Sequence, residues 1–169
     1  MKTHTIVDSP LGPLTLVATD GVLSALYMDA QRYLPDEAMF GERTPAGFEE
    51  IERQLAEYFA GERTAFTVPL APQGTLFQRR VWDGLARIPY GETRTYGQLA
   101  VEISDAHMTR AVGSATGRNP LGIVVPCHRL IGADGSLTGY AGGLERKRFL
   151  LDLEQGRIPL AGWPMAVAG

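Results

Sequence analysis

One stretch of the chain, NPLGIVVPCHRLIG at residues 119–132, holds the side chains best suited to nucleophilic chemistry. Cys127 is the single cysteine of the 169 residues, so it cannot form an intramolecular disulfide, and His128 follows it directly. A free thiol with a pKa of about 8.5 is mostly protonated at neutral pH, so a nucleophilic cysteine needs a nearby base or cation. Cys127 is therefore either an activated nucleophile or a small apolar side chain that fills the core.

The segment before the cysteine sets the geometry of this pair. The apolar run at 122–126 predicts a short buried strand that Pro126 ends, so the thiol would lie in a rigid frame. Adjacent side chains of an extended segment point to opposite sides, so His128 would act as a base through a water molecule or after a sharp bend. A Cys–His hydrolase usually takes its partners from separate segments, and only His4 and His107 are left to supply one. That alternative is poorly supported.

Glu154 is a candidate third participant. The stretch GGLERKRFLLDLEQG at 142–156 predicts a helix that ends at Gly156. Glu154 would lie in the last turn, where the helix dipole disfavours a negative charge. A carboxylate in that place can have a specific partner such as His128, which it would orient as a triad acid orients its histidine. The alternative is an ordinary solvated glutamate.

The region between residue 74 and the cysteine predicts a helix-turn-helix pattern. The amphipathic stretch TLFQRRVWDGLARI at 75–88 predicts a first helix. Thr95 and Gln98 have the spacing of a capping box, so a further helix should cover 96–103. After a tight turn at SDAHM, a short helix is expected over 109–116. The two short helices on either side of this turn, 96–103 and 109–116, form the helix-turn-helix pattern.

The helix at 109–116 carries small residues and one long cation, Arg110. Its small residues are Ala111, Gly113, Ser114 and Ala115. Such a helix can pack closely inside the domain, or it can press its backbone into a groove of a nucleic acid while Arg110 reaches further. The sequence alone leaves both interpretations open.

The first 73 residues predict a scaffold. THTIVD, LTLVAT and VLSALYM predict an antiparallel β-meander, GFEEIERQLAEYFAGE predicts a helix, and TAFTVPL at 64–70 predicts another short strand. APQG at 71–74 has the composition of a linker. We therefore expect an α+β fold of two small domains. An N-terminal domain at 1–73 has an antiparallel sheet and a helix; a mostly helical C-terminal domain at 74–169 has a winged-helix-like helix-turn-helix motif.

Composition narrows the setting and the partner. Residues 1–73 carry 5 Lys and Arg against 11 Asp and Glu, a net of −6, whereas residues 74–169 carry 11 against 8, a net of +3. The half that contains the cysteine is thus the basic one, which is compatible with an anionic partner. No apolar run is long enough for a signal peptide or a membrane span, and one unpaired cysteine suits a reducing compartment, so a cytoplasmic protein is expected. The few, scattered histidines and the one cysteine predict no metal site.

Four motifs together resemble the O6-alkylguanine-DNA alkyltransferases, also called methylated-DNA:protein-cysteine methyltransferases. They are IPYGETRTYGQLA at 88–100, RAVGSATGRNP at 110–120, PCHR at 126–129 and IGADGSLTGYAGG at 131–143. The detailed match covers 74–156. The resemblance implies direct-reversal repair, in which a damaged nucleotide is flipped out of double-stranded DNA. The alkyl group of O6-alkylguanine, and of O4-alkylthymine, is then transferred irreversibly to a cysteine, once per chain.

This resemblance also implies roles for single residues. Cys127 would be the acceptor, His128 a base that acts through water, and Glu154 the carboxylate that orients His128. Tyr96 would protonate the departing guanine. Asn119 would brace the turn that links the recognition helix to the active-site segment.

The resemblance places the remaining site residues on DNA or around the flipped base. Arg110 would fill the space that the flipped nucleotide leaves. The other DNA-binding positions would be Thr95, Ala111, Gly113 and Ser114, and the substrate pocket would be formed by Val125, Pro126, Tyr140, Ala141 and Gly142. Some relatives carry serine where Ala141 stands, so here only backbone donors would meet the substrate oxygen.

The resemblance implies no cofactor, and the zinc-binding cysteines and histidines of some relatives are missing from this chain. The expected partner is double-stranded DNA containing O6-alkylguanine, bound by a monomer that can cluster on DNA. Two alternatives stay open: a lesion sensor that binds without repair, and the Cys–His hydrolase.

Overall fold

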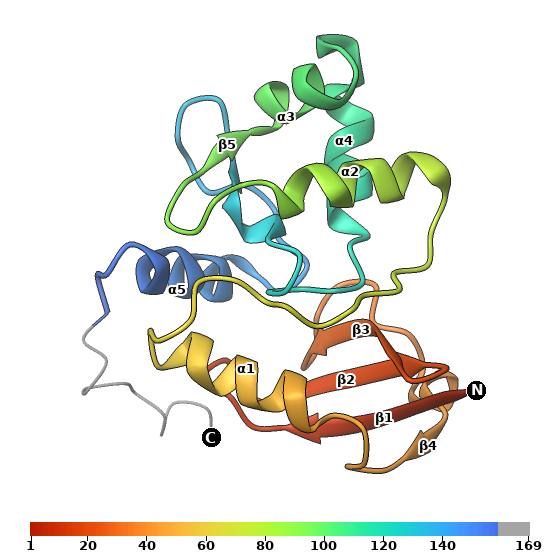
Figure 1. Ribbon diagram of the computed structural model, residues 1–169. Helices are drawn as coiled ribbons and strands as arrows, with labels where there is room; N and C mark the ends of the chain where they lie inside the picture. The colour runs from red at the N-terminus through yellow and green to blue at the C-terminus, as the bar shows by residue number, and fades with distance from the viewer. Residues whose placement is uncertain (159–169) are drawn as a thin grey trace.

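The computed structural model describes residues 1–158, and its N-terminal half is built on a small sheet (Figure 1). Strands β1 (Lys2–Val7), β2 (Leu14–Thr19) and β3 (Val22–Met28) form the antiparallel meander that the sequence predicts. The two-residue strand β4 (Glu42–Arg43) adds to the other edge, parallel to β1, which gives the order β3-β2-β1-β4. A short 3-10 helix, Glu37–Phe40, precedes β4.

Helix α1 (Glu49–Phe59) covers one face of this sheet (Figure 1). Its inward side chains recur with helical spacing, as expected: Ile51, Leu55, Tyr58 and Phe59 are buried, and Phe48 is buried just before the helix. The strand predicted over 64–70 is wrong, because only one isolated bridge, Leu23 to Leu70, forms there. Pro69 has no N–H to donate to a sheet, and the N–H of Thr67 bonds instead to the side chain of Gln54 on α1 (2.9 Å).

The second half is mostly helical, and one of its short helices begins at the predicted cap. It contains α2 (Leu76–Ala86), α3 (Tyr96–Ile103) and α4 (Thr109–Gly117), with a 3-10 turn at Ala106–Met108 between the last two. Thr95 and Gln98 form the predicted capping box, so α3 begins at the expected residue. The strands β5 (Arg94–Thr95) and β6 (Leu130–Ile131) pair in parallel and join α3 to the segment that carries the cysteine.

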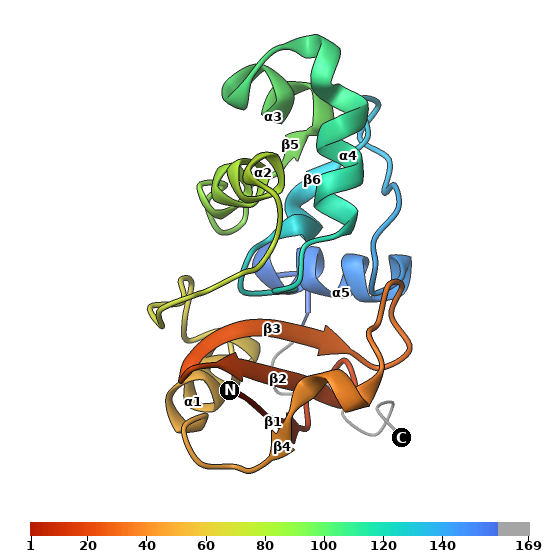
Figure 2. The same ribbon diagram turned by 90° about the vertical axis from the view of Figure 1, so that its right-hand side faces the viewer.

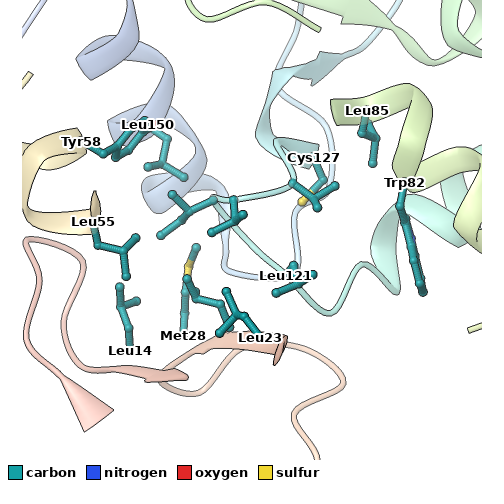
Figure 3. Packing of buried hydrophobic residues seen from close by; sticks show 14 of the residues in the cluster. Leu14, Leu23, Met28, Leu55, Tyr58, Trp82, Leu85, Leu121, Cys127 and Leu150 are labelled. Carbon is teal, nitrogen blue, oxygen red and sulfur yellow. The ribbon is translucent and has the colours of Figure 1, made fainter. Parts of the chain in front are cut away.

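Helix α5 (Leu144–Glu154) lies between the two halves, beside α1 and below the helical half (Figures 1 and 2). One continuous hydrophobic cluster joins the halves: it includes Leu14 and Met28 of the sheet region, Leu150 of α5, Trp82 of α2 and Cys127 (Figure 3). Backbone contacts cross the same boundary, since the N–H of Leu26 donates to the carbonyl of Pro120 (2.8 Å). The α+β fold with a sheet half and a helical half is confirmed, while the domain limits at 1–73 and 74–169 stay predictions.

The predicted buried strand over 122–126 is wrong: the segment is buried but turns back on itself. Ile123 has a φ of +71°, and the N–H of Val125 donates to the carbonyl of Leu121 (2.8 Å). A short apolar run fits a buried strand and a buried turn equally well. Cys127 therefore does not follow a strand but begins a 3-10 helix, Cys127–Arg129.

The described residues contain neither a membrane-spanning helix nor a cluster of metal-binding side chains. Across residues 1–158, none of the helices combines the length and apolar character needed to cross a membrane. The same residues hold no group of three or more His, Cys, Asp or Glu side chains placed to bind a metal ion. The last part of the predicted second domain, 159–169, lies outside the described residues.

Candidate active site

Cys127 lines a cleft of about 740 Å³ in the helical half. The walls come from the start of α3, from α4, from the loop at 133–141 and from two residues of the N-terminal half. The lining residues are Arg32, Tyr33, Thr95, Tyr96, Gly97, Thr109, Arg110, Gly113, Ser114, Thr116, Gly117, Cys127, Ala133, Thr138, Gly139, Tyr140 and Ala141. A concave site of this size can take one planar base with its substituent.

Burial raises the pKa of the Cys127 thiol above its ordinary value. A hydrogen bond with the Asn119 side chain and the positive charge of Lys147 act in the opposite direction but do not overcome burial. The resting thiol is thus protonated at neutral pH, and a reaction at sulfur requires that its proton be removed when the substrate is present.

His128 is fully buried and bonds to Glu154 through Nε2, which lies 2.7 Å from Oε2. Burial lowers the pKa of His128, although Glu154 raises it, so the ring is neutral. An ionised carboxylate can only accept, which assigns the proton of the neutral ring to Nε2 and the lone pair to Nδ1. Nδ1 is buried and has no hydrogen-bond partner within residues 1–158. The atom is free to accept a proton, and no direct hydrogen bond joins it to the thiol.

Glu154 is not a solvated surface residue but the centre of a buried network. Arg129 donates to both carboxylate oxygens: its Nε lies 2.8 Å from Oε1 and its Nη2 lies 2.9 Å from Oε2. The hydroxyl of Tyr58 on α1 donates to Oε2 (2.6 Å). Burial alone would raise the pKa of Glu154, but the bonds from His128 and Arg129 outweigh it and lower the pKa to about 2. The carboxylate is therefore ionised, and Arg129 balances its charge.

Asn119 holds the turn that replaces the predicted strand. Its side-chain nitrogen donates to the carbonyl of Val125 (2.9 Å), and its side-chain oxygen accepts from the N–H of Leu121 (3.0 Å). Both ends of the turn are thus tied to one buried side chain that follows α4 directly. The side chain links α4 to Cys127, at the place where the sequence predicts a brace.

Two of the tyrosines that line the cleft, Tyr96 and Tyr140, have protonated hydroxyls. Burial raises the pKa of Tyr96, whose hydroxyl accepts from Thr138 (3.2 Å) and makes a long contact with the carbonyl of Gly139 (3.5 Å). Burial also raises the pKa of Tyr140 well above its ordinary value, and its buried hydroxyl has no partner in the described part of the chain. Both phenols can therefore donate a proton or a hydrogen bond to a molecule in the cleft.

Most of the positions that the sequence predicts to bind DNA lie around the cleft. Thr95, Arg110, Gly113 and Ser114 line the cleft, and the Arg110 side chain is exposed. Ala111 does not line it, because it is on another side of α4. At Gly113, α4 lies next to Tyr96: an added Cβ would make an ordinary contact, 3.8 Å from the Tyr96 ring.

The residues predicted to form the substrate pocket lie in two places. Tyr140 and Ala141 line the cleft, whereas Val125, Pro126 and Gly142 do not. Val125 and Pro126 are buried at the end of the turn at 121–125, which the Asn119 side chain holds. Gly142 faces the N-terminal half: a Cβ there would lie 2.5 Å from the sulfur of Met28 and 2.8 Å from the Tyr140 ring. The absence of a side chain at Gly142 lets the loop at 133–143, here called the active-site loop, pack on the sheet.

Sequence reasoning missed three residues of the site: Lys147, Arg129 and Tyr58. Lys147 is buried, its ammonium donates to the carbonyl of Thr138 (3.0 Å), and burial lowers its pKa to about 8. A signal was present, since Lys147 and Glu154 stand seven residues apart and therefore on one face of α5. No sequence pattern pointed to Tyr58, which is 96 residues from Glu154.

Comparisons with known proteins match both halves of the chain. Residues 2–72 match the 6-O-methylguanine DNA methyltransferase ribonuclease-like domain, and residues 76–156 match the DNA binding domain of the same family. A methylated-DNA--protein-cysteine methyltransferase of Mycobacterium bovis is 52% identical over 153 residues, 90% of this chain and 92% of the relative. One of Methanosarcina acetivorans is 49% identical over 154 residues, 89% of this chain and 97% of the relative.

Solved structures agree with these matches. A crystal structure of Mycobacterium tuberculosis OGT in complex with DNA superposes with a TM-score of 0.88 at 51% identity, covering 94% of this chain and 96% of that one. A crystal structure of the Mycobacterium tuberculosis O6-methylguanine methyltransferase gives a TM-score of 0.86 with the same identity and coverage.

Proposed function

This chain belongs to the 6-O-methylguanine DNA methyltransferase family and is a DNA alkyl-transfer repair protein, and we propose that Cys127 is the residue that takes the alkyl group. The observation that carries the proposal is the position of this single cysteine: Cys127 lines a cleft together with α4 and directly precedes a neutral, buried histidine. The substrate is O6-alkylguanine, and O4-alkylthymine as a second lesion, in double-stranded DNA.

The proposed reaction includes two proton transfers, one from the Cys127 thiol to His128 and one from Tyr96 to guanine. His128 Nδ1 accepts the thiol proton through a water molecule, and the ionised Glu154 stabilises the resulting imidazolium. The thiolate then forms a bond to the alkyl carbon while the carbon–oxygen bond breaks and its electron pair stays with guanine. Tyr96 donates a proton to the departing guanine, which balances the proton taken up by His128.

The proposed DNA contact explains why α4 is built from small residues. A base inside a stacked duplex cannot reach a buried thiol, so the damaged nucleotide must leave the stack. The backbone of α4 lies against the groove at Gly113 and Ser114, and Arg110 fills the space left in the duplex. We also propose that the protein acts in the cytoplasm as a monomer that can cluster on DNA, without cofactor or metal.

Stoichiometry tests this proposal. The protein is incubated with an excess of duplex in which the O6-methyl group of one guanine is radiolabelled, and label bound to protein is counted over time. Transfer should stop at one methyl group per chain, because the thioether has no route back to a thiol. Continued release of product would favour a turnover hydrolase, and lesion-selective binding without transfer would favour the sensor.

A further inference from the structure

Arg32, Tyr33 and Arg118 form a surface group, here called the Tyr33 patch, that the proposed chemistry does not use. The guanidinium carbon of Arg118 lies 3.8 Å from the centre of the Tyr33 ring, and that of Arg32 lies 4.8 Å from it. Arg32 and Tyr33 belong to the N-terminal half and line the same cleft as Cys127, whereas Arg118 directly follows α4. Cation–π contacts of this length hold both guanidinium groups next to one aromatic ring.

The backbone of the Tyr33 patch is held in place by the active-site loop. The N–H of Arg32 donates to the carbonyl of Ala141 (2.8 Å), and the side chain of Arg146 on α5 donates to the carbonyl of Asp29 (2.7 Å). Tyr33 has a φ of +60°, which is uncommon for a bulky residue and persists only where the surroundings fix it. The patch is thus positioned before any ligand arrives.

The two guanidinium groups of the patch have no carboxylate partner among the described residues. All three side chains are exposed, and within residues 1–158 no carboxylate forms an ion pair with Arg32 or Arg118. By contrast, the exposed Arg53 on α1 pairs with two glutamates of its own helix. Two unpaired guanidinium groups on one ring, beside a cleft, form a preorganised site for an anion.

We propose that the Tyr33 patch binds phosphodiester groups of a DNA strand at the C-terminal end of α4, away from Arg110 at its start. Arg110 and Arg118 are eight positions apart, so the rise of a helix separates them by about 12 Å along α4. Guanidinium groups suit phosphate oxygens, and the N-terminal half then contributes directly to DNA binding. The inference rests on the proposed function, because it takes DNA as the ligand.

The salt dependence of DNA binding tests the patch. Duplex binding is measured by fluorescence anisotropy over a series of salt concentrations, with a Cys127→Ser background so that no methyl group is transferred. Replacing Arg32 and Arg118 by Gln should lower affinity by about fivefold to tenfold per arginine near 0.1 M salt and reduce the slope of log K against log salt by about 1 per arginine. The same losses should occur on undamaged DNA, because phosphates carry no lesion.

Matched variants decide whether the effect belongs to the patch. Arg43→Gln removes the same charge from β4, at the sheet edge opposite β3 and outside the cleft, and should leave affinity and slope unchanged. Tyr33→Phe should bind as the parent does, while Tyr33→Ala should lose affinity because the ring no longer positions the guanidinium groups. An unchanged slope in the Arg32→Gln, Arg118→Gln protein, or an equal loss with Arg43→Gln, would overturn the inference.

Methyl transfer in the Cys127 protein separates this inference from the proposed function. With free O6-methylguanine base, which has no phosphate, the single variant Arg118→Gln, whose residue is not among those lining the cleft, should react at the parent rate. If the unsubstituted protein transfers no methyl group from DNA, the proposed function fails. If it transfers normally and the patch variants bind DNA as the parent does, only the patch inference fails.

Discussion

The buried network around Glu154 and the exposed arginines of the cleft differ in how their charges are balanced. Glu154 accepts bonds from His128, Arg129 and Tyr58, so its charge is compensated within the fold. In the described residues, Arg32, Arg110 and Arg118 have no carboxylate partner. Proton transfer at Cys127 needs fixed, paired groups, whereas binding of a polyanion needs cations that are still free. The paired charges thus lie inside the protein, and the unpaired cations of the cleft lie on its surface.

The largest expected effect comes from unbalancing the network. Glu154→Gln keeps the side-chain shape but leaves the buried Arg129 without a countercharge, so stability in urea should fall by about 3–5 kcal/mol. Methyl transfer should slow by about 100-fold or more, because His128 loses its orienting carboxylate. Glu102→Gln is the control: this exposed glutamate lies 3.8 Å from Arg94, and its loss should change stability by less than about 0.5 kcal/mol.

Acid should weaken the network more than the rest of the fold. The folded pKa of Glu154, about 2, lies below the unfolded value of 4.5, so its contribution is present above about pH 4.5 and is lost as pH falls toward 2. It amounts to about 3 kcal/mol. The lowered pKa of His128 acts in the same direction below its unfolded value of 6.5. Urea midpoints measured between about pH 7 and pH 3 should fall more steeply for the parent than for Glu154→Gln; parallel curves would contradict this.

On the exposed side, removal of Arg110 should affect DNA and not chemistry. Arg110→Ala should slow transfer from duplex DNA by about tenfold, because nothing replaces the flipped nucleotide in the stack. Transfer from free O6-methylguanine base should change by less than about twofold. Equal losses on the two substrates would mean that Arg110 acts on the reacting groups and would remove the distinction between the two regions.

Removal of Lys147, which is buried and bonds to the carbonyl of Thr138, should have the smallest effect. Its charge lowers the pKa of Cys127, so Lys147→Met should slow transfer at pH 7 by about fivefold. Because the pKa of Lys147 is about 8, the parent rate should level off as pH rises through that value, while the Met variant continues to gain as its thiol ionises. Identical pH profiles would exclude an electrostatic role for this lysine.

The sequence predicts local elements well where a short-range signal decides them. The capping box at Thr95 and Gln98 gives the first residue of α3, and alternating apolar residues give the three strands of the meander. The apolar run before Cys127 gives a wrong strand prediction, because its composition indicates that the segment is buried but not that it is extended. The turn there depends on bonds from the Asn119 side chain.

Long-range partners set the limit of what the sequence reveals about the site. Glu154 could be singled out by its place in the last turn of a helix, but Arg129 and Tyr58 become its partners only through packing of α5 against α1 and the cysteine segment. The Tyr33 patch likewise joins two halves of the chain through one aromatic ring. The roles of Cys127, His128, Tyr96 and Asn119 remain predictions that the geometry supports.

The most direct test of the central claim is the mass of the intact protein after incubation with a duplex that contains O6-methylguanine. The account predicts one added methyl group per chain, located by peptide mass on Cys127 and absent from a Cys127→Ser control. An unchanged mass despite tight, lesion-selective binding, or a methyl group on any other residue, would contradict it.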